Sequence, residues 1–123
     1  MIKWEKKGLI VSPKSFKLKW WKSFGMDPCS IHLRGDVYRI FFCGRDNKNV
    51  SNIGFVDYDL SKFKVVKISK QPVLKPGSLG SFDDNGVTAS CALRINSKIY
   101  LYYIGWKPKS TTRYSLMSGL AIS

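Results

Sequence analysis

The stretch Asp36-Val-Tyr-Arg-Ile-Phe-Phe-Cys-Gly44 has a near counterpart later in the chain, Lys98-Ile-Tyr-Leu-Tyr-Tyr-Ile-Gly105. Both read as aromatic strands that run into a glycine, and a second short apolar run precedes each across a polar turn. A Gly-centred strand follows each copy, at 52–57 and 118–123. Self-similar units of three or four antiparallel strands are typical of a β-propeller, in which each blade needs a neighbour to cover its apolar face. The repeat therefore predicts propeller blades, with function at the central channel.

The remaining sequence is typical of an all-β protein. No stretch of a dozen residues keeps apolar positions at helical spacing, whereas strand-like runs are dense. With 123 residues and 44% hydrophobic content, the chain fits a single domain over residues 1–123. We predict one blade at about residues 25–70 and a second at about 82–123, which makes a partial five-bladed propeller, because a closed ring needs four or more blades. Strands are expected near residues 8–11, 30–33, 37–43, 52–58, 64–68, 88–94, 99–104 and 118–122.

The chain is strongly basic, with a formal net charge of +13. This charge is compatible with nucleic-acid binding, because lysines neutralise phosphates and release counterions. The lysines, however, are spread over residues 1–22 and alternate with apolar residues at 61–70, as on the solvated face of a strand. No zinc-finger spacing or recognition-helix pattern is present. We expect a solvated basic face rather than a nucleic-acid footprint, and an anionic glycan or polyphosphate fits the same charge.

The cysteines and the N-terminus bear on cofactors and location. Cys29, Cys43 and Cys91 are an odd number without CxxC spacing, which indicates reduced thiols and neither a disulfide framework nor a metal site. No metal and no cofactor is expected. The N-terminus lacks the apolar segment of a signal peptide, and no apolar run reaches the roughly 18 residues of a membrane span. The sequence predicts a cytoplasmic protein without a membrane partner.

Three of the eight acidic residues are candidates for catalysis. Asp27 directly precedes the first strand of one copy, and Asp83 and Asp84 stand at the corresponding place before the second. On a propeller these positions lie at the mouth of the channel, and two neighbouring carboxylates can separate their pKa values as acid and base catalysis requires. The alternative is that Asp-Asp-Asn-Gly at 83–86 is an ordinary turn.

The residues at 27–42 resemble the opening of the five-bladed β-propeller glycosidases of family 43, in which an Asp-Pro-Ser stretch precedes Gly-Asp-x-Tyr-Tyr-Leu. Other segments are similar to glycosidase-like propeller proteins of the family 43, 32 and 130 type that are often found with surface-polysaccharide genes. The resemblance covers nearly the whole chain and implies the first two blades of a longer protein. The segments that carry it are 44–46, 51–57, 71–77, 82–87, 100–106 and 119–123.

The resemblance also implies catalytic roles. Asp27 matches the general base that acts on water. The carboxylate that tunes the acid would fall at 87–91, where the chain has none, so Asp83 or Asp84 is a displaced candidate. The glutamate that protonates the leaving oxygen has no counterpart, because Glu5 is the sole glutamate and precedes the first blade. Hydrolysis needs an acid and a base roughly 5 to 9.5 Å apart, so we expect these residues alone to be inactive.

Binding residues are expected at the loop ends, because aromatic faces stack on the C–H surfaces of sugars and planar polar groups bind the hydroxyls. The alternative for Trp20 and Trp106 is that they fill space between blades. Arg45 and Asp46 directly follow a strand, and they either bind ligand or bridge the blades. The candidates for substrate binding are Arg45, Asp46, Asn85, Trp106, Trp20 and Tyr114.

Three functions remain open. The first is a fragment of a glycoside hydrolase-like protein that acts on a glycan of surface polysaccharide metabolism, the second is a non-catalytic carbohydrate-binding or assembly module, and the third is a basic nucleic-acid binder. The partner expected under the first two is a glycan or small saccharide. Two blades would leave apolar faces and a sheet edge uncovered, so we also expect self-association.

Overall fold

A computed structural model describes all residues from Met1 to Ser123. The chain is all-β with antiparallel sheets, as predicted, and carries one short helix. The strand expected near residues 8–11 is absent, and Gly8 there has a φ of 99°, which strands do not adopt. The elements are α1 (Pro13–Phe16), β1 (Ser23–Arg34), β2 (Val37–Arg45), β3 (Ser51–Asp59), β4 (Lys64–Ile68), β5 (Val87–Ile95), β6 (Lys98–Pro108) and β7 (Tyr114–Ile122).

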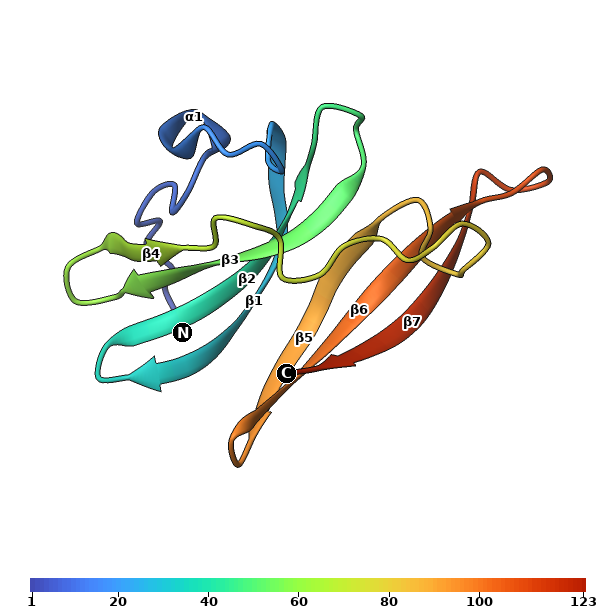
Figure 1. Cartoon of the computed structure of the whole chain (residues 1–123). Coiled ribbons are helices and arrows are strands. Elements are labelled where there is room, and N and C mark those ends of the chain that lie inside the picture. Colours follow the sequence, from blue (N-terminus) through green and yellow to red (C-terminus); the bar gives the residue numbers. More distant parts are fainter.

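The strands form two sheets, one with the order β1-β2-β3-β4 and the other with the order β5-β6-β7 (Figure 1). Each sheet consists of hairpins between strands that follow one another in sequence. β1 turns into β2 at Gly35 and β5 turns into β6 at Asn96, and both residues have positive φ, 48° and 55°. The repeat in the sequence is thus a repeated hairpin with the same left-handed turn position.

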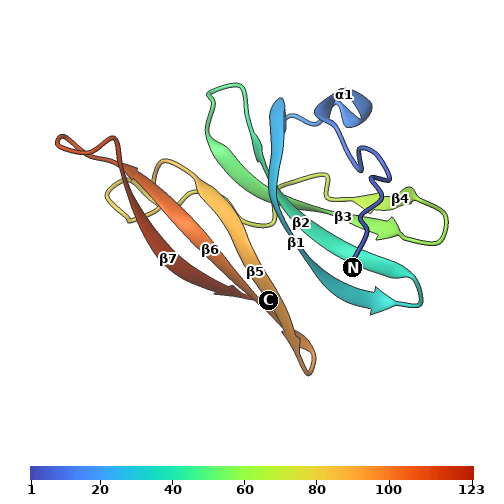
Figure 2. The same ribbon diagram turned by 180° about the vertical axis from the view of Figure 1, so that it is seen from behind.

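The two sheets lie side by side in both views, and β5 contacts β1, β2 and β3 (Figures 1 and 2). They span residues 23–68 and 87–122, which overlap the two predicted blades at about 25–70 and 82–123. The expected partial propeller is not observed, because the arrangement is neither closed nor propeller-like. The sequence pattern reflects hairpin formation within each sheet, and that pattern does not require a ring.

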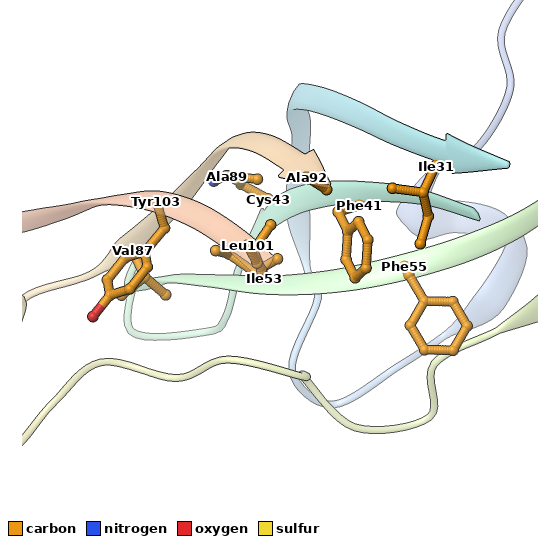
Figure 3. Packing of buried hydrophobic residues seen from close by; sticks show 10 residues of the cluster. All are labelled: Ile31, Phe41, Cys43, Ile53, Phe55, Val87, Ala89, Ala92, Leu101 and Tyr103. Atoms are coloured by element: carbon orange, nitrogen blue, oxygen red, sulfur yellow. The ribbon is translucent and has the colours of Figure 1, made fainter. Parts of the chain in front are cut away.

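The main core lies between the two sheets (Figure 3). Alternate residues of β2 and β3 face the second sheet, because successive strand side chains point to opposite faces. Phe41 and Phe55 from the first sheet meet edge to face, with ring centroids 6.4 Å apart. The buried members of this core are Ile31, Phe41, Cys43, Ile53, Phe55, Val87, Ala89, Ala92, Leu101 and Tyr103.

The N-terminal segment covers the other face of the first sheet. Trp20 and Trp21 are buried there against Phe42, and Trp21 lies 4.6 Å from the Phe42 ring, centroid to centroid. The indole N–H of Trp20 donates to the carbonyl of Ser69. Trp20, a candidate binding residue from the sequence, therefore packs in this cluster and closes the sheet from outside.

Strand glycines make room for these aromatic rings. A side chain at Gly44 would collide with Trp21, and one at Gly54 would collide with Trp20. In the second sheet, Gly105 lies under Phe82 in the same way. The repeat in the sequence is defined by a strand that runs from aromatic residues into a glycine. In each sheet, an aromatic ring from the preceding segment packs against that glycine.

The helix α1 is a single turn within this N-terminal segment. The Ser12 hydroxyl caps it by accepting a hydrogen bond from the backbone N–H of Lys14, and Pro13 occupies the first helical position, where no N–H is needed. The helix ends at Lys17, which has a left-handed conformation with a φ of 48°. No helix in the structure is long and apolar enough to cross a membrane.

The outer face of the second sheet has no cover. Leucines and a tyrosine that point away from the core remain largely exposed there, because no segment of the described chain reaches this side of β5, β6 and β7 (Figure 2). The edge strand β7 carries no charged residue, whereas the other free edge, β4, carries Lys64 and Lys67. The exposed apolar residues of this face include Leu93, Ile95, Tyr102, Leu116, Leu120 and Ile122.

Candidate functional site

A small polar pocket lies where the loop ends of the two sheets meet. Its cavity volume is about 70 Å³, and residues from both sheets line it. Four of the binding residues expected from the sequence meet here, although they come from four different parts of the chain. The lining residues are Met26, Arg45, Asn49, Ser51, Asn85, Thr88, Trp106 and Tyr114.

Backbone contacts hold the two sheets together beside the pocket. Ser51, at the start of β3, forms an isolated parallel bridge with Gly86, and its hydroxyl donates to the carbonyl of Val87 at 2.9 Å. On the other side, Trp106 donates its backbone N–H to Gly86 and accepts one from Asn85, both at 3.0 Å. The strand β6 and the segment before β5 are thus fixed against β3, and the pocket has a rigid frame.

Trp106 forms the aromatic wall of the pocket and is half-buried. Its indole N–H donates to the hydroxyl oxygen of buried Thr88 at 3.2 Å. Its ring meets Tyr114 edge to face, with centroids 5.2 Å apart and planes at 77°. Because both ends of the indole are fixed by neighbours, the ring is oriented before any ligand arrives.

Arg45 supplies the positive charge. It ends β2, and its guanidinium lies 4.7 Å from the centre of the Phe24 ring. Its side chain donates from Nη1 to the Asn49 side-chain oxygen at 3.1 Å and forms no ion pair with a carboxylate. The Nε atom is buried and has no hydrogen-bond acceptor.

Asp46 does not line this pocket, although it follows Arg45 directly. Its carboxylate accepts hydrogen bonds from the backbone N–H groups of Lys48 and Val50, at 2.9 and 3.1 Å. These bonds close the turn between β2 and β3. Asp46 therefore shapes the loop that presents Asn49, and of the two alternatives in the sequence, ligand binding or bridging the sheets, the structure shows neither.

Asp27 lies on β1 next to Met26 but does not line the pocket. It is exposed, and its φ of 52° places it in an irregular part of the strand where the register with β2 shifts. Its negative charge acts on the Cys43 thiol. Burial raises the pKa of Cys43 to about 12, and the negative charge of Asp27 adds a smaller rise.

Asp83 is buried and fully occupied by structural contacts. One carboxylate oxygen accepts from the Ser81 hydroxyl at 2.7 Å and the other from the Tyr103 hydroxyl at 3.0 Å. Burial raises the pKa of Tyr103, and the hydrogen bond to Asp83 raises it further. Because Asp83 shares the Tyr103 side of the second sheet, it faces the core between the sheets.

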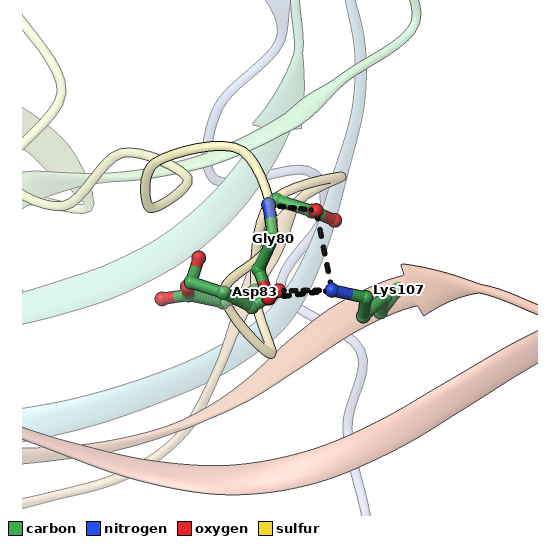
Figure 4. A network of polar contacts seen from close by, with 5 residues as sticks. Gly80, Asp83 and Lys107 are labelled. Atoms are coloured by element: carbon green, nitrogen blue, oxygen red, sulfur yellow. Dashed lines mark hydrogen bonds and ion pairs between the residues drawn. The ribbon is translucent and has the colours of Figure 1, made fainter.

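Asp84 stabilises the loop before β5. Its carboxylate accepts from the backbone N–H of Gly80 at 2.9 Å and lies 3.5 Å from the ammonium of Lys107. Lys107 also donates to the carbonyls of Gly80 and Ser81, so one lysine ties the loop to β6 (Figure 4). None of Asp27, Asp83 and Asp84 lines the polar pocket, and the carboxylates of Asp83 and Asp84 are held by contacts with the loop and with β6.

Four lining residues were not found from the sequence. Ser51 is the first residue of β3 and Thr88 the second residue of β5, and both are buried. Asn49 has a left-handed φ of 63° in the turn before β3. Met26 comes from β1. A small polar residue at the start of each predicted strand was the available signal, since strand ends are where loops place binding groups.

Comparison with known proteins gives relatives but no family. No family model matches the chain. The chain is similar to two uncharacterized proteins of Mycobacterium tuberculosis, from strains CDC 1551 / Oshkosh and ATCC 25618 / H37Rv. Each is 40% identical over 121 residues, which are 98% of this chain and 40% of the relative. The chain thus spans about two fifths of the length of the curated relatives it matches.

These findings correct the family expected from the sequence. The resemblance to five-bladed glycosidase-like propellers of the family 43, 32 and 130 type is wrong, because the two sheets are not propeller-like, and neither the uncharacterized relatives nor a family model supports a glycosidase. The segments that carried the resemblance are mainly aromatic strands and the glycines beneath aromatic rings. Packing inside each sheet accounts for them.

Proposed function

We propose that the chain binds a saccharide in the pocket between the loop ends of its two sheets. The observation that carries this proposal is the oriented indole of Trp106 beside the polar side chains of Arg45 and Asn85. A flat aromatic wall next to planar polar groups is suited to a sugar ring, which has an apolar C–H face and a rim of hydroxyls.

The polar groups of the pocket are available to a ligand. The side-chain amide of Asn85 and the hydroxyl of Tyr114 make no hydrogen bond within the protein, and both residues line the pocket. Thr88 accepts the indole N–H, so its own hydroxyl hydrogen is free to be donated. The site can therefore donate and accept without breaking an existing contact.

The proposal is for binding and not for hydrolysis. Glycoside hydrolysis uses two carboxyl groups that flank the scissile bond. No Asp or Glu lines this pocket, and the carboxylates of Asp83 and Asp84 are held by the loop and by Tyr103. The pocket fits the carbohydrate-binding module better than the glycosidase fragment.

A nucleic-acid ligand is the weaker proposal. It rests on the net charge of +13 alone, since the lysines do not gather around the pocket, where Arg45 is the sole charged lining residue. A binder of phosphate backbones would lose affinity steeply with added salt. A saccharide held by stacking, by neutral hydrogen bonds and by the single charge of Arg45 would lose much less.

The proposal is tested by calorimetric titration of the chain with a panel of neutral and acidic oligosaccharides, at two salt concentrations. We expect binding that Trp106→Ala weakens by up to about tenfold, since an aromatic contact is worth roughly 0.5–1.5 kcal/mol beyond the area it buries. Trp4→Ala is the control, because Trp4 is exposed in the N-terminal segment and far from the lining residues in sequence. Absence of saccharide binding in the unaltered chain, with a folded spectrum, would overturn the proposal.

A further inference from the structure

The pocket contains one cation that the protein itself leaves unpaired. Arg45 is the only charged residue of the lining, and none of the ion pairs in the structure includes it. Its Nη1 donates to the neutral Asn49 amide, while its Nε is buried without an acceptor. This Nε atom is also the only buried side-chain nitrogen or oxygen in the structure without a hydrogen-bond partner. Such orphaned donors are rare in native proteins and point to a missing acceptor.

A second arginine on the same strand shows the satisfied arrangement. Arg39 donates from Nε and Nη2 to the two carboxylate oxygens of Asp57, at 2.8 and 3.0 Å, and its guanidinium lies 3.8 Å from the Phe55 ring centre. Arg45 has the matching aromatic neighbour in Phe24 but no carboxylate. Its Nε and Nη2, the pair that Arg39 uses, are both without a hydrogen bond to the protein.

We propose that the ligand of this pocket is an acidic saccharide and that its carboxylate binds the Nε and Nη2 edge of Arg45. This inference rests on the proposed saccharide site and names the class of sugar that the site selects. A carboxylate is planar and presents two oxygens at the spacing of the guanidinium fork, so it would satisfy both donors at once. The cavity of about 70 Å³ holds one such substituent while the ring stacks outside on Trp106.

The surrounding charge favours the same ligand. The chain carries a formal net charge of +13, and no acidic side chain lines the pocket to repel an anion. This long-range attraction acts on any anion, however, and does not depend on one arginine. The experiment must therefore separate a specific contact with Arg45 from general attraction to a basic protein.

The experiment compares acids with their esters. Oligomers of galacturonate, glucuronate and mannuronate and the N-acetylneuraminate glycoside are titrated beside their methyl esters, which keep the ring and remove the charge. We expect one acid to bind at least about tenfold more tightly than its ester, as for a charge-assisted pair. This preference should vanish in Arg45→Gln, which removes the charge. It should also vanish in Arg45→Lys, because lysine keeps the charge but lacks the two parallel N–H donors of the guanidinium.

Arg94→Gln is the matched control. Arg94 is exposed on β5 and does not line the pocket, so its removal lowers the net charge by the same amount. The preference for the acid should survive in this variant. Near-ultraviolet circular dichroism and thermal melting confirm that each variant keeps its fold.

The outcomes separate the two proposals. Equal affinity for acid and ester would overturn the carboxylate contact and leave the saccharide site standing. An equal loss in Arg94→Gln and Arg45→Gln would reduce the effect to general charge and also overturn it. A preference for sulfated oligosaccharides over carboxylates would contradict the planar acceptor, and absence of binding to every saccharide would overturn both proposals.

Discussion

The hydroxyl of Tyr103 donates a hydrogen bond to Asp83, with 3.0 Å between the two oxygens, and both side chains are buried on the inner side of the second sheet. Asp83 also accepts from Ser81, so its carboxylate joins the loop before β5 to the strand β6. A residue that the sequence marked as a catalytic candidate thus holds the second sheet to its preceding loop. The same loop positions Asn85 and Gly86 at the pocket.

The first prediction concerns this pair. Asp83→Ala leaves the buried Tyr103 hydroxyl without an acceptor and should lower the free energy of unfolding by about 2–3 kcal/mol. Tyr103→Phe leaves Asp83 with its bond from Ser81 and should lower the free energy of unfolding by about 1–2 kcal/mol. The double variant should lose less than the sum, since the shared bond is counted once. Urea unfolding of the four proteins measures this coupling, and strict additivity would mean that the bond contributes nothing.

The second prediction follows from the raised pKa of Tyr103, which burial and Asp83 cause. A folded-state pKa above the unfolded value means that the stability contribution is complete below the unfolded pKa of about 10 and is lost as the pH rises through the folded pKa. The unfolding free energy should therefore fall above about pH 10, and less steeply in Tyr103→Phe. Unfolding curves between pH 8 and 11 with the same slope in both proteins would contradict this assignment.

The third prediction concerns the seat of an aromatic ring. Gly44→Ala should destabilise the chain by roughly 1–3 kcal/mol, because the added methyl group collides with the Trp21 indole. Gly25→Ala is the control, since its added carbon would lie 3.5 Å from the same ring, an ordinary contact. Chemical unfolding followed by tryptophan fluorescence compares the two, and similar stabilities would show that Trp21 moves aside at no cost.

The fourth prediction concerns the thiols. Burial raises the pKa of Cys43 to about 12 and that of Cys29 to about 11, whereas Cys91 is exposed. Because the thiolate is the reactive form, at pH 8 only about one Cys43 side chain in ten thousand is ionised. A thiol reagent should label Cys91 first and Cys43 last, and the Cys29 rate should rise with pH up to its pKa. Mass spectrometry of partially labelled protein gives the order, and early labelling of Cys43 would show that the core opens.

The fifth prediction concerns the outer face of the second sheet. Leu116 and Leu120 are 53% and 47% exposed there, and the neighbouring edge of β7 carries no charge to prevent strand pairing. We expect two copies of the chain to associate through this face, and Leu116→Lys with Leu120→Lys should yield monomers. Leu79→Lys, in an exposed loop, is the control. Light scattering coupled to size-exclusion chromatography measures the molar mass of the unaltered chain and of each variant. A monomeric unaltered chain at high concentration would contradict the expectation.

Much of the fold was predictable because it follows from local pattern. The turn at Gly35 and the apolar run from Ile40 to Cys43 predict a hairpin strand, and the structure buries both faces of this run. The arrangement of the two sheets was not predictable, since the repeat specifies the hairpins of each sheet and the glycines that make room for aromatic rings. It does not specify how one sheet packs on the other. The expected strand at 8–11 failed because Ile10 and Val11 belong to a segment that follows the sheet without pairing to it.

The pocket was partly predictable for a related reason. Arg45, Asn85, Trp106 and Tyr114 stand at strand ends, where loops place binding groups. The role of Asp83 was hidden, because its partner Tyr103 is far along the chain and lies within a strand that reads only as apolar. The free edge of the Arg45 guanidinium was equally hidden, since the sequence does not show which of two arginines on one strand finds a carboxylate.

The central claim is that a sugar stacks on Trp106 beside Arg45, and the indole N–H resonance of Trp106 reports on it most directly. In a proton–nitrogen correlation spectrum of the labelled chain, an acidic oligosaccharide should shift the Trp106 indole signal and the side-chain Nε–H of Arg45 with one common affinity. The signals of Trp4, Trp20 and Trp21 should stay in place, because these residues do not line the pocket. If every uronate and neuraminate oligomer leaves the Trp106 signal unmoved at saturating concentration, the saccharide site is contradicted.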